Sequence, residues 1–241
     1  MTLPILPRPV YSCELPSNGQ KVEYYPFTIK ELKSLMIAQQ SEDIEISVNT
    51  IKNVILSCLK TKVNNELTVF DLEYLFIKLR SVSIGESIEL IFKCDVCTSP
   101  KAKTKVNVDL NTAVLEKHER HSNKIPLFGD VGIVMKYPSL TGLELLNTIN
   151  FDDLTSEDTD KFIDIIIESI DYIYDSEQMY PSNEQKKSDM VKFIEQLDED
   201  ALYKMKLFFD TMPEVRLYVD YVCPECGREH NKYVSGISTF F

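Results

Sequence analysis

The chain has 241 residues, of which 44% are hydrophobic and 27% are charged, and its formal net charge at pH 7 is −12. These proportions are close to average soluble usage, so they argue against a disordered chain and against a membrane-spanning one. The length allows one large domain or two small ones, with a core that needs no disulfides. The start of the chain lacks a basic region followed by an apolar run, so we expect an intracellular protein.

The negative charge is concentrated in one part of the sequence. Residues 141–210 contain 18 acidic and 6 basic residues, whereas residues 101–140 contain 4 acidic and 7 basic ones. An acidic helical stretch repels phosphate backbones, so nucleic acid is not expected to bind there. Two interpretations remain for this stretch: a solvated helical face, or a docking surface for a basic partner.

The N-terminal half begins with prolines and continues with helices. Residues 1–20 are expected to form an extended arm, because each proline biases its neighbour away from helix. The alternation in "QKVEYYPF" predicts a short strand. Helices are then expected over 28–40, over 47–60, and over 68–84 with Thr68 as N-cap.

The remaining elements alternate between strands and helices. "ESIELIFKC" and "KAKTKVNVDL" alternate as half-buried strands, and residues 112–124 are a polar connector with some helical character. A strand pair should turn at Gly129-Asp130. Further helices are expected near 139–150, 157–175, 186–197 and 199–211, and "EVRLYVDYVC" and "EHNKYVSG" predict two closing strands.

The expected fold class is α+β. A small antiparallel β-module, N-terminal helices and a zinc-ribbon-like site would occupy residues 21–138 and 212–241, with an acidic helical lobe inserted over 139–211.

Two cysteine pairs carry the most specific chemical signal. Cys94 and Cys97 follow one predicted strand, and Cys223 and Cys226 follow another. Two such turns present four thiolates to one tetrahedral ion in a zinc ribbon. In "CPECG", Gly227 can adopt the positive φ that lets backbone N–H groups point at sulfur.

The two pairs are far apart in sequence. Closing the 125-residue span between Cys97 and Cys223 costs roughly 4 kcal/mol. Structural zinc sites are worth roughly 10–16 kcal/mol in peptides. We therefore expect one structural zinc ion per chain, held by Cys94, Cys97, Cys223 and Cys226. Separate redox or free thiol pairs and a disulfide-bearing form remain as alternatives, although a thioredoxin-like pair would have to open a helix.

Other polar groups are weaker candidates. His230 could replace a cysteine as ligand, and the spacing of His118 and His121 favours a solvated helical face over a second metal site. Cys13 and Cys58 are expected to be ordinary thiols. The sequence contains no P-loop, GxGxxG motif or Ser-His-Asp arrangement, so we expect no enzyme and no small-molecule substrate.

Several segments together resemble a known family. They are "LPILPRPVYSCELPSNGQKVEYYPFTIKE", "FDLEYLFIKLRSVSIGESIELIFKC", "VGIVMKYPSL" and "KMKLFFDTMPEVRLYVDYVCPECGREHNKYVSGISTFF". In this order they are similar to the baseplate hub assembly proteins of T-even-type contractile-tailed bacteriophages. The resemblance implies a non-enzymatic factor of the infected bacterial cytoplasm that binds other baseplate hub proteins, either as a released chaperone or as part of the virion baseplate.

A second hypothesis competes with this one. Zinc ribbons are common in nucleic-acid-binding and transcription accessory proteins, and Lys101, Lys103 and Lys105 would offer a small basic surface near the ribbon. The acidic net charge favours the assembly hypothesis, under which no nucleic acid and no membrane is bound.

Overall fold

The computed structural model describes residues 6–41, 43–63, 67–149 and 155–240. The chain divides into two compact units, which we call the first unit (residues 1–116 and 214–241) and the second unit (residues 117–213). The insertion therefore begins at Lys117, earlier than the expected 139, because the strand pair around Gly129 belongs to the inserted unit.

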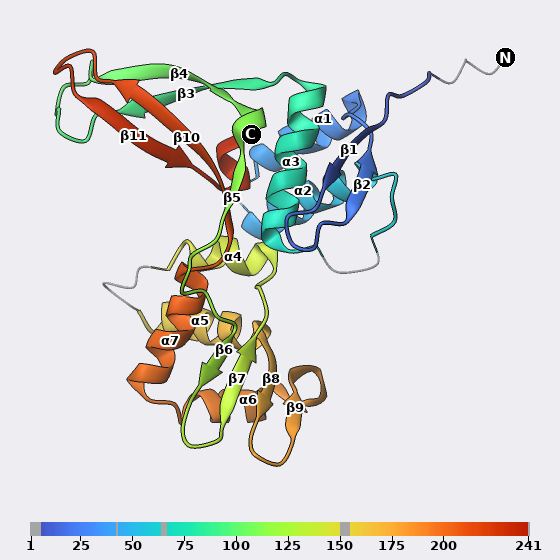
Figure 1. Ribbon diagram of the computed structural model, residues 1–241, viewed down its shortest axis with the longest axis vertical. Coiled ribbons are helices and arrows are strands. Elements are labelled where there is room, and N and C mark those ends of the chain that lie inside the picture. The colour runs from blue at the N-terminus through green and yellow to red at the C-terminus, as the bar shows by residue number, and fades with distance from the viewer. Residues whose placement is uncertain (1–5, 42, 64–66, 150–154, 241) are drawn as a thin grey trace. The chain divides into compact units, whose positions relative to one another are not determined.

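The first unit begins with a hairpin and three helices (Figure 1). β1 (Tyr11–Glu14) pairs antiparallel with β2 (Lys21–Tyr24), so the described part of the proline-rich arm includes a paired strand. α1 (Ile29–Gln39) starts with a capping box between Thr28 and Glu31, as its sequence predicts. α2 (Ile44–Cys58) and α3 (Val69–Ser83) follow, and α2 begins three residues earlier than expected.

α3 is the central helix of the first unit. Most of its residues are buried, including the expected apolar positions, and Thr68 is its N-cap, as predicted. The fully buried carboxylate of Asp71 accepts hydrogen bonds from the Thr68 N–H (3.2 Å), the Thr68 hydroxyl (2.8 Å) and the Ser17 N–H (3.0 Å). The Asp71 side chain thus completes the capping box of α3 and attaches the β1–β2 turn to the helix.

The rest of the first unit is built from two hairpins and a short added strand. β3 (Ser87–Lys93) pairs with β4 (Lys103–Asp109), and a 3₁₀ turn follows at Leu110–Thr112. β10 (Glu214–Val222) pairs on one side with β11 (Glu229–Val234) and on the other with β5 (Val114–Glu116). Figure 1 shows the two hairpins side by side, before the chain ends in a 3₁₀ turn at Ile237–Phe240.

The second unit is a four-stranded antiparallel sheet with helices. The strands are β6 (Lys124–Pro126), β7 (Gly132–Met135), β8 (Ile170–Tyr174) and β9 (Met179–Pro181), in that spatial order. The helices are α4 (Leu140–Leu146), α5 (Ser156–Glu168), α6 (Lys187–Ile194) and α7 (Glu199–Asp210). Ile133, Ile166, Met190 and Phe208 represent the core that the sheet shares with α5, α6 and α7.

Three expectations from the sequence are wrong in this region. The helix predicted over 157–175 ends at Glu168, and its last residues form β8, the partner of β7. The polar connector contains the strand β5. The lobe expected to be helical therefore contains a sheet, although its helices and the turn at Gly129 (φ 58°) lie where they were expected.

The sequence suggested that His121 lies on a solvated helical face. In the structure it contacts the core of the second unit instead. Its ring stacks on Phe208 and Tyr137, its Nδ1 lies 3.0 Å from the Thr211 hydroxyl, and its Nε2 lies 3.1 Å from the Tyr137 hydroxyl. Because the Thr211 hydroxyl donates to the Leu207 carbonyl, it accepts from Nδ1–H, so the Nδ1 atom of His121 carries a proton. Burial lowers the pKa of His121, which favours the neutral form of the ring.

The role of Asp71 can be tested by substitution. Asp71→Ala removes the carboxylate half of the capping box at the start of α3 and leaves the Ser17 N–H without its acceptor, so we expect the free energy of unfolding to fall by about 2–4 kcal/mol. Chemical denaturation of the full chain measures this value. Glu45→Ala, at an exposed acid in the first turn of α2, is the control and should change it by less than about 0.5 kcal/mol. Equal effects of the two substitutions would contradict the role of Asp71.

Candidate metal centre

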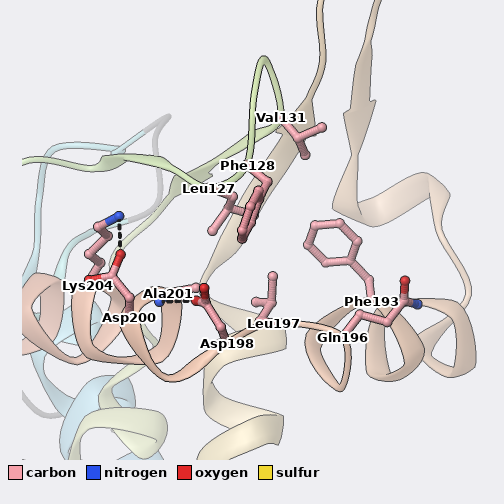
Figure 2. A pocket seen from close by; sticks show the side chains of 10 residues that line it. All are labelled: Leu127, Phe128, Val131, Phe193, Gln196, Leu197, Asp198, Asp200, Ala201 and Lys204. Atoms are coloured by element: carbon pink, nitrogen blue, oxygen red, sulfur yellow. Dashed lines mark hydrogen bonds and ion pairs between the residues drawn. The ribbon is translucent and has the colours of Figure 1, made fainter.

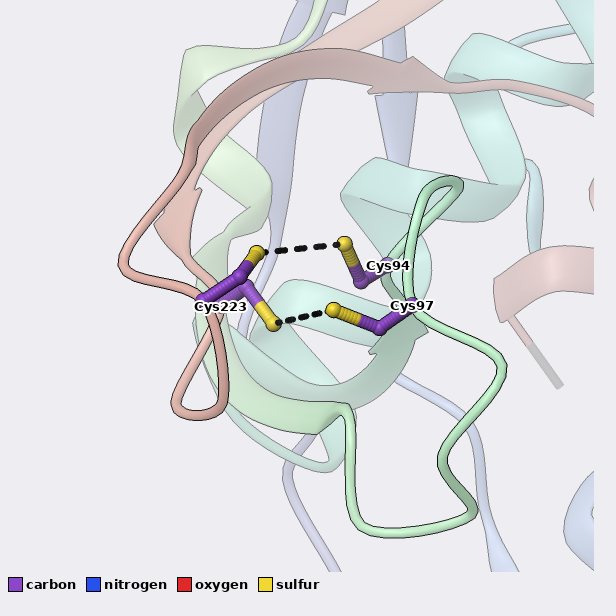
Figure 3. Close-up of side chains that lie close together, drawn as sticks. Cys94, Cys97 and Cys223 are labelled. Atoms are coloured by element: carbon purple, nitrogen blue, oxygen red, sulfur yellow. Dashed lines mark hydrogen bonds between the residues drawn. The ribbon is translucent and has the colours of Figure 1, made fainter.

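The four cysteines singled out in the sequence meet at one point of the first unit. Cys94 directly follows β3 and Cys223 directly follows β10, so the two hairpins carry the two pairs at corresponding ends. The Sγ atoms of Cys94 and Cys226 are 3.9 Å apart. Those of Cys97 and Cys223 are also 3.9 Å apart (Figure 3). All four sulfur atoms lie within 4.8 Å of one another.

The turn at the second pair has the predicted geometry. The Gly227 N–H donates to the Cys223 carbonyl (3.0 Å), the Cys223 N–H donates to the Arg228 carbonyl (2.9 Å), and Gly227 has φ 69°. A residue with a Cβ rarely adopts this conformation, which explains the glycine after the second cysteine. The first pair has no glycine, and there the Cys94 N–H donates to the Ala102 carbonyl (3.0 Å).

Contacts between the hairpins hold the two turns together. The Tyr221 hydroxyl donates to the Lys93 carbonyl (3.0 Å), and its ring stacks on Phe92 at a centroid distance of 5.0 Å. The Thr104 hydroxyl donates to the Val222 carbonyl (3.0 Å). Sequence reasoning missed Tyr221 and Thr104 as supporting residues, because alternation predicts which strand residues are buried but not which strand they meet.

The spacing of the sulfurs distinguishes between kinds of thiol site. A disulfide joins two sulfurs at about 2.05 Å, much closer than the 3.9 Å observed. A tetrahedron with metal–sulfur bonds of about 2.3 Å has edges of about 3.8 Å. The four cysteines therefore have dimensions that are compatible with a metal ion at their centre.

The two cysteines of the first pair have pKa shifts of opposite direction. The backbone N–H groups of Val96 and Cys97 point at the Cys94 sulfur and lower the pKa of Cys94 to about 6. Hydrogen bonding with Cys226, together with burial and the other thiols, raises the pKa of Cys97 to about 12. Ionisation of one thiol in the cluster therefore opposes ionisation of its neighbour, and a cation among the four sulfurs would favour the thiolate form.

Charged and aromatic groups surround the cluster without joining it. Asp95 forms an ion pair with Lys232 (2.6 Å), and the His230 Nδ1 lies 3.9 Å from the Asp95 carboxylate. His230 stacks on Tyr221 at 4.7 Å, and it is not one of the four clustered ligand groups. Cys58 is buried at the end of α2 and Cys13 is half-buried in β1, so neither belongs to the cluster.

A separate hollow lies in the second unit. It has a volume of about 350 Å³, and Figure 2 shows apolar side chains at its wall, among them Leu127, Phe128 and Phe193. Phe128 is 78% exposed beside the turn at Gly129, which is unusual for an aromatic ring. On the opposite side of the hollow, Asp198 caps α7, and Asp200 pairs with Lys204 (2.6 Å).

The fold and this centre define a class: a two-unit α+β protein with a four-cysteine cluster. The family model described as T4 bacteriophage base plate protein matches residues 8–241, so the chain belongs to this family. It is 28% identical over 235 residues to the baseplate hub assembly protein gp26 of Enterobacteria phage T4, covering 96% of this chain and 97% of that protein. No solved structure matches the chain. Among its described residues, no helix is both long enough and apolar enough to cross a membrane.

Proposed function

We propose that the protein is a non-enzymatic assembly factor or structural subunit of the central hub of a contractile-tailed phage baseplate. The observation that carries this proposal is the family match over nearly the whole chain, together with a relative of equal extent that is named a baseplate hub assembly protein. It would act in the host cytoplasm by contacts with other hub proteins, and either remain in the baseplate or leave it after assembly.

Zinc is the ion proposed for the four-cysteine cluster. It favours tetrahedral thiolate sites, and the sulfur spacing is compatible with its bond lengths. Four protein ligands leave no open position for water or substrate, so the ion would stabilise the fold rather than catalyse a reaction. Bound zinc would tie the β3–β4 turn to the β10–β11 turn and so make the first unit rigid, as a scaffold for partners requires.

We expect one zinc ion per chain, and its loss on Cys223→Ser. Because the binding free energy of a structural metal is also folding free energy, the variant should lose cooperative unfolding as well. Native mass spectrometry measures the metal content, and thermal denaturation measures the cooperativity. The matched control is Cys58→Ser, at a buried cysteine outside the cluster, which should keep its zinc. A wild-type chain that is fully folded and free of metal would contradict the proposal.

The second unit offers a surface for a basic partner. It contains 20 acidic and 10 basic residues, so it carries most of the negative charge of the chain. The hollow beside Phe128 adds an apolar anchor point to this acidic unit. A hub protein segment that carries a large apolar side chain next to lysine or arginine is complementary to both features.

Co-expression with the hub proteins of the same phage tests this function. We expect a stable complex, and a loss of affinity of about tenfold on Phe128→Ser if this ring is an anchor. Met179→Ser is the matched control, because Met179 is 65% exposed at another strand of the same unit. Repeated purification of the chain alone from such mixtures, even at low salt, would count against the hub role.

One observation supports the alternative of a zinc-ribbon nucleic-acid-binding or transcription accessory protein. Lys93, Lys103 and Lys105 lie on the exposed side of the β3–β4 hairpin, next to the cysteine cluster. Lys105 is paired with Glu89 (2.7 Å), and the net charge of the chain is strongly negative, so we rank this function second. Binding of DNA with a steep salt dependence would reverse the ranking.

A further inference from the structure

The edge strand β1 is bonded on one side only. The hairpin closes with a hydrogen bond from the Leu15 N–H to the Gln20 carbonyl (2.9 Å), and the pairing with β2 continues without a shift. Antiparallel neighbours alternate between bonded and non-bonded pairs, so Ser12 and Glu14 turn their main-chain N–H and C=O groups away from β2. Within the residues that the structure describes, these outward groups have no hydrogen-bond partner.

The opposite edge of the same hairpin is covered. The Glu23 N–H donates to the Thr61 hydroxyl (2.8 Å), and the Glu23 carbonyl accepts from the Lys60 N–H (2.8 Å). The Tyr25 N–H donates to the Cys58 carbonyl (2.9 Å). The described chain thus covers the outer edge of β2 at Glu23, whereas the outer edge of β1 is left open, and an open edge is a template for another strand.

A hollow of about 530 Å³ runs along β1. Its wall includes all four residues of the strand and, from α3, the row Tyr74, Lys78 and Val82. These three residues are spaced by four and so form one stripe of a helix that is otherwise mostly buried. The Lys78 ammonium lies 5.1 Å from the centre of the Tyr74 ring. The stripe is thus largely apolar and carries one cation.

We propose that β1 accepts an extended segment of a partner polypeptide, which pairs with Ser12 and Glu14 and lies on the α3 stripe. Main-chain hydrogen bonds would provide affinity, and alternate side chains of the segment would enter the hollow. Those side chains should be β-branched or aromatic where they meet Tyr74 and Val82. The choice of a hub protein as the source of the segment rests on the proposed function, but the mode of binding does not.

A second copy of this chain fits the hollow less well than a segment of another protein. In a second copy, α3 lines the hollow beside β1 in the same way. Pairing β1 of one copy with β1 of the other would therefore bring the two α3 helices against each other. An extended segment has no such helix. Burial raises the pKa of Cys13 to about 11 and that of Tyr24 to about 12, so these two wall groups are uncharged at neutral pH and suit an apolar side chain.

The test uses overlapping 12-residue peptides from the hub proteins of the same phage and the full chain. At least one peptide with alternating apolar residues should bind in fluorescence anisotropy. Ser12→Pro removes an outward N–H and should weaken binding about 3- to 10-fold, the worth of one main-chain hydrogen bond. Proline is tolerated on such an edge, and Ser12→Ala, which keeps the N–H, is the matched control and should bind normally.

Amide exchange on the wild-type chain gives a second measurement that does not depend on the folding of a variant. With bound peptide, exchange at Ser12 and Glu14 should slow, while Cys13, whose N–H faces β2, should change little. Absence of any binding peptide, binding without these changes, or self-association through β1 would overturn the proposal. A full-length complex formed despite such a result would leave the proposed function intact.

Discussion

The first unit depends on one constraint: the chain must return to a sheet that it left at Glu116. β10 pairs with β5 from before the insertion and with β11 from the end of the chain, and it presents Cys223 at its tip. Four sulfurs within 4.8 Å join this strand to the β3–β4 hairpin. The entropic cost of closing a loop grows only with the logarithm of its length. The binding free energy of a metal ion in this cluster would therefore exceed that cost by several kcal/mol.

The second unit is independent of that constraint. Its own sheet and helices enclose a separate core. In the sequence, one segment of the first unit precedes it and another follows it. Such an insertion can vary without disturbing the cysteine cluster. This separation places the four-cysteine cluster in one unit and an acidic surface with an exposed aromatic ring in the other.

The sequence predicts some features of this molecule better than others. The pairing of Cys94 and Cys97 with Cys223 and Cys226 was predictable, because strand patterns flank both pairs and four thiolates have few other uses. β8 was not, since "IDYIY" follows the helix α5 without a Gly or Pro, and its two isoleucines are three residues apart, which fits a helical period. Residues 170–174 form a strand because they pair with β7, which is a tertiary effect.

Single residues show the same limit. Thr68 was predictable as the N-cap of α3, but the hydrogen bond from the Ser17 N–H to Asp71 links residues that are 54 positions apart. His121 belongs to a polar sequence and still stacks on Phe208, because the chain folds back onto α7. Local pattern predicts caps and turns well, whereas it cannot identify contacts made by residues that are distant in the chain.

The central claim is that four thiolates hold one zinc ion. X-ray absorption at the zinc edge, on the full chain purified without added metal, tests it most directly. We expect four sulfur neighbours at about 2.3 Å from zinc. Nitrogen or oxygen neighbours in place of sulfur, or the absence of zinc from the folded protein, would contradict it.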